Sequence, residues 1–332
     1  MADYYLTADI GGTQIRAALC DSSGRIYHRA QDLTRAAEGK EAVLQRIKAT
    51  LARAMGDTPP QAVRGIGIVA PGPLDPEAGV IVFAPNLPGW ENVPLQRIVE
   101  EHFGIPTWLG NDANLAALGE HRFGAGRGID NLIYVTVSTG IGGGIICHGR
   151  MLVGAHGFAA EVGHHTIEAN GIRCNCGNVG CLETVASGPA IARMAREALA
   201  AGRRSVLPSL VDGQIDQITS RTVFEAAQQG DELSIEIFHR AGTYLGVGMV
   251  NLLHLFNPDM IIIGGSVSKA GHFLFDPMWA VIRERSHPIY WERLQIVPPQ
   301  LGDDVGLLGA LALALDQCAA RNAAPQVATS DS

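Results

Sequence analysis

The chain has 332 residues and a mass of 35.1 kDa, which favours two domains, and with 47% hydrophobic and 17% charged residues it is expected to fold. Its net charge of −8 argues against a protein that wraps nucleic acid, because phosphate binding on that scale needs surplus Lys and Arg. The sequence contains neither a signal peptide nor an apolar stretch of membrane-spanning length, so we expect a cytoplasmic protein with no membrane partner, whose six cysteines are reduced or metal-bound.

The first half of the chain predicts a β-hairpin around a glycine turn, followed by helices and strands in alternation. Proline near the start of the second helix is compatible with a first helical turn. The expected elements are strands 4–10, 16–20 and one from 24, helix 39–55, strand 64–70, helix 94–103, strand 106–110, and a helix 115–123 capped by residues 111–114.

The second half opens in the same way, which we interpret as a sign of a duplicated architecture. A strand at 132–137 is followed by a glycine turn at 138–144 and a returning strand at 145–147. Further expected elements are helices 189–201, 222–229 and 233–256, a buried strand 260–263, helices 277–285 and 305–319, and a frayed polar tail from residue 321.

Glycine is unusually abundant, at 40 residues, and three glycine-rich segments follow predicted strands. The first, Asp9-Ile10-Gly11-Gly12-Thr13, could aim backbone N–H groups at phosphate while its carboxylate binds Mg²⁺, although one such turn alone could be a plain hairpin. Neither hairpin turn fits the lysine-containing phosphate loop or the dinucleotide fingerprint. Because similar segments occur at 139–143 and 264–265, a nucleotide-binding cleft is favoured.

A cluster of metal-ligand residues follows the pattern H-x9-C-x-C-G-x2-G-C, formed by His164, Cys174, Cys176 and Cys181. Three thiolates and one imidazole suit a closed structural zinc site, which orders a loop and leaves no open position for catalysis. Inert core cysteines are the alternative, and spacing cannot separate His164 from the adjacent His165. The remaining cysteines are expected in the core: Cys20, Cys147 and Cys318.

Besides Asp9, three carboxylates are candidates for chemistry. Asp112, next to Asn111, lies at a strand-to-helix junction, where spacing alone favours helix capping. Glu161 and Glu183 flank the zinc ligands, and folding of that loop would bring both together as acceptors for a polyhydroxylated ligand. Surface solvation is the alternative for either glutamate.

These motifs together resemble those of the ROK family of sugar kinases and sugar-responsive repressors, in the family's order and over nearly the whole chain. The resemblance implies an α/β, actin-like (ribonuclease H-like) fold of two duplicated domains around a central cleft, with ATP-dependent hexose kinase activity. The matching segments are 9–13, Ala70-Pro71-Gly72-Pro73-Leu74-Asp75, Asn111-Asp112-Ala113-Asn114, 139–144, Glu161-Val162-Gly163-His164, and 174–183.

The resemblance also implies residue roles. Asp112 matches the general base, and His164 matches both a zinc ligand and a sugar ligand. The other sugar-binding positions are Gly72, Asn86, Asn111, Glu161 and Glu183, together with Asp112 itself; the nucleotide-binding positions are Asp9, Gly11, Gly12, Thr13, Thr139, Gly140, Gly142, Gly264 and Gly265.

We therefore expect a small domain of residues 1–115 with about 305–322, a large domain of residues 116–304 with the zinc loop 164–181, and a disordered tail at 323–332. The expected reaction transfers phosphate from ATP, with Mg²⁺, to the 6-hydroxyl of glucose in a homodimer or homotetramer. Alternatives are N-acetylmannosamine, N-acetylglucosamine, fructose or mannose as acceptor, and polyphosphate as donor. A sugar-responsive regulator without its DNA-binding module is an alternative from a different functional class, and it is disfavoured because the first strand begins near residue 4. A second such alternative is a chaperone-like or filament-forming ATPase, which would not need the zinc loop.

Overall fold

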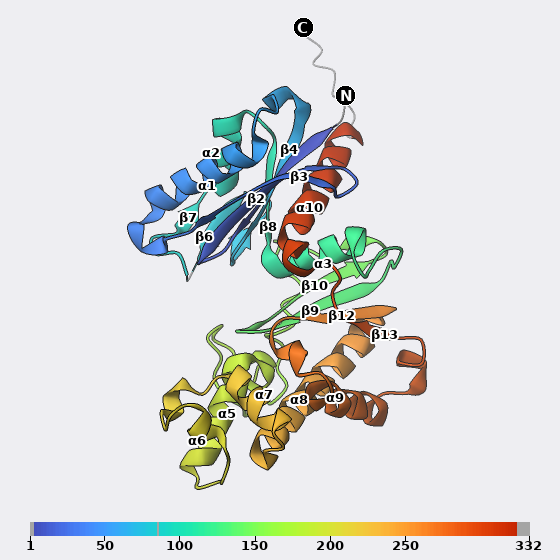
Figure 1. Cartoon of the computed structure of the whole chain (residues 1–332). Coiled ribbons are helices and arrows are strands. Elements are labelled where there is room, and N and C mark those ends of the chain that lie inside the picture. Colours follow the sequence, from blue (N-terminus) through green and yellow to red (C-terminus); the bar gives the residue numbers. More distant parts are fainter. Residues whose placement is uncertain (1–2, 85, 324–332) are drawn as a thin grey trace. The chain divides into compact units, whose positions relative to one another are not determined.

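The computed structural model describes residues 3–84 and 86–323 and divides the chain into two compact units (Figure 1). Unit 1 consists of Met1–Gly128, Val153–Ala159 and Gln300–Ser332, and unit 2 of Ile129–Leu152 and Ala160–Pro299. The first division therefore falls after Gly128, not at the predicted 115/116. Residues 324–332 of the expected tail lie outside the described residues.

Unit 1 is built on a five-stranded sheet in the order β3-β2-β1-β4-β8. Strands β1, β2 and β3 are antiparallel neighbours, while β4 runs parallel to β1 and β8 parallel to β4. The predicted opening hairpin is thereby confirmed. The strand bounds are β1 Tyr4–Ile10, β2 Gln14–Asp21, β3 Ile26–Leu33, β4 Val63–Ala70 and β8 Thr107–Asn111.

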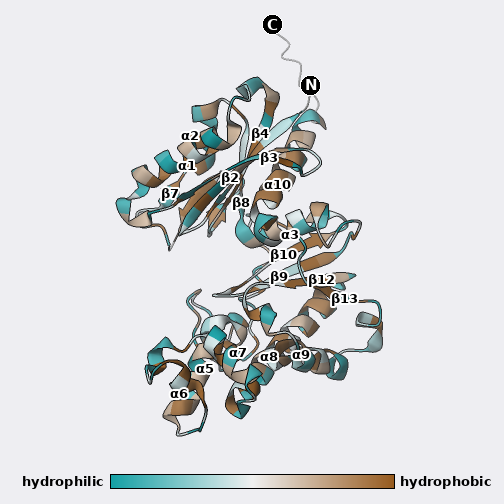
Figure 2. Ribbon diagram, in the orientation of Figure 1, coloured by the Kyte–Doolittle hydropathy of each residue, from teal (hydrophilic) through white to brown (hydrophobic). Residues whose placement is uncertain are grey.

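Helices cover both faces of this sheet, and the alternation of side chains along β1 shows the two faces. Leu6 belongs to the cluster that packs under α1 and α2, whereas Tyr5 belongs to the cluster under α10. Figure 2 shows hydrophobic (brown) and hydrophilic (teal) residues interspersed along the helices and strands. The helices of unit 1 are α1 Lys40–Met55, α2 Leu95–Phe103, α3 Asp112–Phe123 and α10 Val305–Ala323.

Helix α10 packs directly onto α3 and the sheet because glycines remove the side chains that would hold them apart. A Cβ at Gly309 would overlap the main chain of Leu115 in α3, and one at Gly67 in β4 would overlap Ala310 in α10. Part of the glycine excess is therefore used in helix packing. This packing also explains why unit 1 includes the whole of α3.

A buried carboxylate fixes the segments that follow α3 and precede α10. Glu120 is fully buried, and its oxygens accept hydrogen bonds from the backbone N–H groups of Ala125 (2.8 Å), Gln300 (3.0 Å) and Leu301 (2.9 Å). Three main-chain donors stabilise this carboxylate, which forms no ion pair with a cationic side chain among residues 3–84 and 86–323.

A small antiparallel sheet beside the main one was not predicted from the sequence. Its strands are two to four residues long, too short for a clear alternation of apolar and polar residues. It consists of β5 Leu74–Asp75, β6 Val80–Phe83 and β7 Glu91–Val93.

Unit 2 repeats the strand order of unit 1 as β11-β10-β9-β12-β13, with β9 and β10 as the antiparallel hairpin and β12 parallel to β9. The predicted duplication is confirmed. The strand bounds are β9 Leu132–Val137, β10 Ile141–Cys147, β11 Arg150–Met151, β12 Met260–Gly264 and β13 Gln295–Val297.

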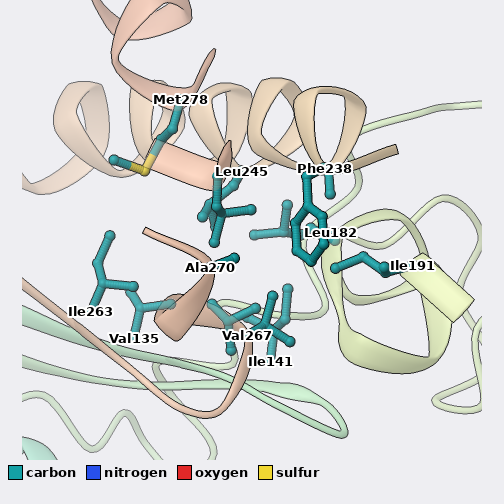
Figure 3. Close-up of a cluster of buried hydrophobic side chains, with 14 of the residues drawn as sticks. Val135, Ile141, Leu182, Ile191, Phe238, Leu245, Ile263, Val267, Ala270 and Met278 are labelled. Carbon is teal, nitrogen blue, oxygen red and sulfur yellow. The ribbon is translucent and has the colours of Figure 1, made fainter. Parts of the chain in front are cut away.

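The helices of unit 2 pack around the cluster of apolar side chains in Figure 3. Helix α9 begins five residues before Pro277, which the sequence placed at its start; the proline is buried and packs against Gly242 of α8. The helices are α4 Glu183–Ala186, α5 Gly188–Ala200, α6 Leu207–Leu210, α7 Ser220–Gln228, α8 Glu232–Phe256 and α9 His272–Arg285. Among the described residues, no helix combines the length and apolar character needed to cross a membrane.

Candidate functional site

The first glycine turn joins β1 to β2 and is held by its own backbone. The N–H of Gly11 donates to the carbonyl of Gln14 (2.8 Å), and the buried hydroxyl of Thr34 donates to the carbonyl of Gly11 (2.6 Å). Gly12 lies against Asn86, since a Cβ at Gly12 would be 3.0 Å from the Asn86 Cβ. The fold thus brings a predicted nucleotide residue next to a predicted sugar residue.

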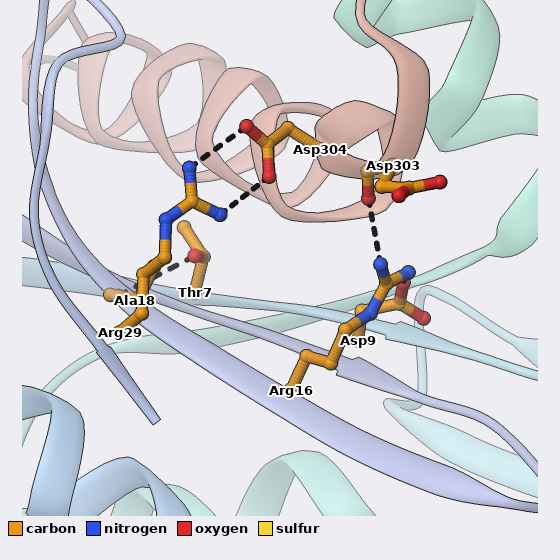
Figure 4. A network of polar contacts seen from close by, with 7 residues as sticks. All are labelled: Thr7, Asp9, Arg16, Ala18, Arg29, Asp303 and Asp304. Atoms are coloured by element: carbon orange, nitrogen blue, oxygen red, sulfur yellow. Dashed lines mark hydrogen bonds and ion pairs between the residues drawn. The ribbon is translucent and has the colours of Figure 1, made fainter. Parts of the chain in front are cut away.

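The carboxylate of Asp9, at the end of β1, is held by Arg16 (Figure 4). Arg16 lies directly opposite Asp9 in the hairpin register, and its other terminal nitrogen donates to the carbonyl of Asp303 (2.7 Å). Gly306 of α10 closes the other side of Asp9. Sequence reasoning missed Arg16, although a charged residue inside a buried strand opposite Asp9 was a usable signal.

Asn111, not Asp112, caps helix α3. The Asn111 side chain accepts hydrogen bonds from the N–H groups of Ala113 (3.0 Å) and Asn114 (3.5 Å), so the helix begins at Asp112 and not at residue 115 as predicted. A Cβ at Gly72 would lie 3.0 Å from the Asn111 side-chain nitrogen, which places two predicted sugar residues in contact. The side chain of Asn111 therefore performs the helix capping, and the side chain of Asp112 is not needed for it.

The environment of Asp112 suits a proton acceptor. Its side chain reaches solvent, but the surrounding mass of protein raises its pKa, and the negative charge of Asp9 raises it further. The N–H of Ala113 donates to it (2.8 Å) and partly offsets this effect. A carboxylate with a raised pKa is a stronger base than an ordinary aspartate.

The second glycine turn is shorter than predicted, because β10 begins at Ile141. Thr139 and Gly140 lie in the turn, whereas Gly142 is a strand residue paired with Thr136. The Glu183 carboxylate accepts the N–H of Ile141 (2.8 Å), and a Cβ at Gly140 would be 2.5 Å from it. A predicted sugar ligand therefore contacts the predicted phosphate turn.

The third glycine segment lies beside the second. Gly264 ends β12, and Gly265, with φ of 91°, packs against the main chain of Val137, where a Cβ would overlap. The hydroxyls of Ser138 and Ser266 are 3.0 Å apart. Next to this segment is a cavity of about 350 Å³, lined by Ser220, Arg221, Phe224, Phe238, Ser266, Val267, Lys269 and Ala270.

The predicted metal ligands converge. The ligand atoms of His164, Cys174, Cys176 and Cys181 lie within 4.8 Å of one another, and the His164 Nδ1 faces the Cys174 sulfur at 3.7 Å. His165 instead places its Nδ1 2.5 Å from the carbonyl of Val162. The geometry resolves the ambiguity in favour of His164 and leaves its Nε2 on the opposite side of the ring. This donor set fits a tetrahedral zinc ion.

Hydrogen bonds to main-chain carbonyls bring the flanking carboxylates to the same loop. Asn178 donates from its side chain to the carbonyl of His164 (3.1 Å), the N–H of His164 donates to the carbonyl of Glu161 (3.0 Å), and that of Glu183 to Gly163 (3.0 Å). Glu161, His164 and Glu183 thus come from two segments tied together around the Cys/His cluster.

The predicted site residues fall in both units. Unit 1 carries Asp9, Gly11, Gly12, Thr13, Gly72, Asn86, Asn111 and Asp112; unit 2 carries Thr139, Gly140, Gly142, Glu161, His164, Cys174, Cys176, Cys181, Glu183, Gly264 and Gly265. Within each unit, glycine turns lie beside residues predicted to bind sugar.

A family model described as the ROK family matches residues 5–317. The chain belongs to the ROK family. A glucokinase of Thermotoga maritima is 39% identical over 306 residues, covering 92% of this chain and 95% of that protein. A xylose repressor of Caldicellulosiruptor bescii is 34% identical over 309 residues, covering 92% of this chain and 77% of that protein.

Among solved structures, the ROK family glucokinase of Streptomyces griseus in complex with glucose and AMPPNP is 38% identical to this chain. It superposes with a TM-score of 0.74 and covers 94% of this chain and 99% of that one. The expected actin-like fold of ROK sugar kinases is therefore confirmed.

Proposed function

We propose that this ROK protein is an ATP-dependent hexokinase of the glucokinase type, which phosphorylates the 6-hydroxyl of glucose. The observation that carries the proposal is Asp112, a carboxylate at the start of α3 whose pKa is raised by the surrounding protein and by the charge of Asp9. The similarity to glucokinases over nearly the whole chain supports the same reaction.

In the proposed mechanism, Asp112 accepts the proton of the sugar 6-hydroxyl as that oxygen forms a bond to the terminal phosphorus of ATP, while the bond from this phosphorus to the bridging oxygen breaks and ADP leaves. Asn111 is fixed by its capping bonds to α3, so its side chain offers a rigid hydrogen-bonding group beside the base. Together with Gly72, Asn86, Glu161, His164 and Glu183, it is proposed to bind the sugar hydroxyls. Phosphoryl transfer depends mainly on such positioning and on charge stabilisation.

The phosphates are proposed to lie along the backbone of the glycine turns: Gly11, Gly12 and Thr13 in unit 1, and Thr139 and Gly140 in unit 2. Magnesium bound with ATP would neutralise the developing negative charge, and the Asp9 carboxylate is the residue proposed to hold it. Arg16 keeps that carboxylate in one orientation.

The adenosine is proposed to occupy the cavity beside Gly264 and Gly265. Its volume of about 350 Å³ is within the range of small-molecule sites. Phe224 and Phe238 offer apolar surface for a base, while Arg221 and Lys269 supply positive charge.

The Cys/His cluster is proposed to hold a structural zinc ion, which supplies no open coordination position for catalysis. A hydrogen bond from the backbone N–H of Asn178 lowers the pKa of the Cys176 thiol, whereas burial raises the pKa of the Cys174 and Cys181 thiols, so a bound zinc ion would displace the protons of these two. With Nδ1 of His164 committed to the cluster, its Nε2 is proposed to donate to or accept from a sugar hydroxyl.

A coupled assay of ADP release with ATP and Mg²⁺ tests the function over a panel of glucose, mannose, fructose, N-acetylglucosamine and N-acetylmannosamine. We expect glucose to give the highest kcat/KM. A higher value for an N-acetylhexosamine would reassign the substrate, and ADP release independent of every sugar would reject a sugar kinase. The same assay with polyphosphate in place of ATP tests which phosphate donor the enzyme uses.

We also propose that the protein is cytoplasmic and forms a homodimer or homotetramer.

Replacing Arg16 by methionine is expected to raise the KM for Mg·ATP about tenfold, because Asp9 loses the charge-assisted hydrogen bond that orients it. Arg29→Met is the matched control, since it removes a bidentate but exposed ion pair with Asp304 between β3 and the same loop before α10. Initial-rate measurements in Mg·ATP check this. Equal KM values for the two variants would contradict the positioning role.

A further inference from the structure

A second cavity in unit 2 has an unusual concentration of positive charge for a protein of net charge −8. Its volume is about 360 Å³, and Arg173, Arg193 and Arg196 line it together with a single acidic residue, Glu183. It shares none of its lining residues with the cavity beside Gly264 and Gly265.

Two of these arginines are fixed in orientation by the main chain. Arg193 and Arg196 lie three residues apart on one face of α5. Arg193 donates to the carbonyl of Thr184 (2.8 Å), and Arg196 donates to the carbonyl of Ile218 (3.0 Å). A guanidinium anchored in this way loses little conformational freedom when it binds a second group.

The cavity keeps an excess of positive charge, since its three arginines are opposed by Glu183 in the lining and by Glu197, which pairs with Arg193. Arg193 pairs with Glu197, which is largely exposed, whereas neither Arg173 nor Arg196 has a carboxylate partner within 4 Å among the described residues. Glu183, the one carboxylate in the lining, is already bonded to the N–H of Ile141. Guanidinium groups arranged around a cavity match the oxygens of phosphate better than those of any neutral ligand.

The position of the cavity further limits which kind of ligand could bind there. Its wall includes Thr139, from the glycine turn between β9 and β10, and Cys174 and Asn175 of the metal loop. A ligand in the cavity would therefore contact both segments. We propose that this cavity is an anion subsite for a phosphate-bearing small molecule, with Arg193 and Arg196 as its main ligands. The proposal does not require the kinase reaction, because binding is measured without turnover.

Isothermal titration calorimetry of the zinc-loaded chain with sodium tripolyphosphate and with glucose 6-phosphate tests the subsite. For at least one of these ligands, we expect Arg193→Gln/Arg196→Gln to raise Kd at least about tenfold, since each lost charged hydrogen bond is worth roughly that factor. Arg203→Gln, which removes only the surface pair with Glu236, should leave Kd unchanged. A preference for tripolyphosphate would identify the donor's phosphate chain as the source, and a preference for glucose 6-phosphate a phosphorylated sugar.

Arg196→Lys controls for a loss of binding that is caused by unfolding, because lysine keeps the positive charge and removes only the planar guanidinium group. We expect its Kd to fall between those of the wild type and of Arg196→Gln, with zinc content and unfolding temperature close to wild type. Wild-type affinity of the double glutamine variant for both ligands would overturn the proposal, as would equal weakening by Arg203→Gln.

Discussion

Replacing Asp112 by asparagine is expected to lower kcat at least about 100-fold while glucose still binds, because the amide keeps the size of the side chain and cannot accept the hydroxyl proton. The capping of α3 should survive, since Asn111 performs it. Steady-state kinetics and calorimetric titration with glucose measure the two effects separately. Asp316→Asn, which removes an exposed carboxylate paired with Arg122 of α3, is the control and should keep normal turnover.

The pH profile gives a second measure of the same group. The surrounding mass of protein and the charge of Asp9 raise the pKa of Asp112, so the acidic limb of kcat/KM for the wild type should have its midpoint above the ordinary aspartate value of about 3.9. Near-normal turnover of Asp112→Asn, or an acidic midpoint at the ordinary value, would remove Asp112 from the mechanism as the base.

The raised pKa also has a consequence for stability. The native carboxyl group holds its proton more tightly than the unfolded one, so between the ordinary and the raised pKa the native state binds more protons and its stability falls as pH rises. At neutral pH the ionised group is therefore unfavourable to folding. Asp112→Asn should unfold at the same temperature as the wild type or higher, even though it is inactive.

Loss of the metal is the second change with a large expected effect. Cys176→Ser should abolish the binding of one zinc per chain and lower kcat/KM for glucose at least about 100-fold, because Glu161, His164 and Glu183 are positioned by the loop that the cluster closes. Elemental analysis of protein never exposed to chelator, with kinetics on the same sample, checks both parts.

Cys147→Ser is the matched control for that variant. Cys147 is the last residue of β10 and is exposed, contrary to the prediction of a core position, because the strand ends there in the turn to β11. The control should retain its zinc and its kinetics. Wild-type protein that contains no zinc, or a zinc-free variant with full activity, would refute the assignment.

The sequence predicted local patterns better than the positions where strands give way to turns and helices. The hairpins, the buried strand before Gly264 and the long helices were found, because apolar periodicity specifies them. The starts of α3 and β10 were missed, because Asn111 can cap a helix only if the chain turns there, and Gly142 is compatible with both a turn and a strand.

Side-chain partners were harder still. Spacing placed four metal ligands but could not choose between His164 and His165, since that choice depends on which imidazole the loop turns towards the thiols. The contact of Arg16 with Asp9 could be predicted only with knowledge of the pairing register of the hairpin, which places the two residues opposite each other. The arginine-lined cavity forms because α5 and the zinc loop (residues 164–181) both contribute to its wall, and no local sequence pattern encodes that proximity.

The bonds of Glu120 to Gln300 and Leu301 have a consequence for biosynthesis. They join residues about 180 positions apart, and α10, which packs on β1, β4 and α3, follows the whole of unit 2 in the chain. A ribosome therefore synthesises every element of unit 2 before α10 can pack on the sheet of unit 1. Until then the apolar face of β1 and β4 lacks its covering helix α10, so we expect the nascent first unit to aggregate more readily than the finished chain.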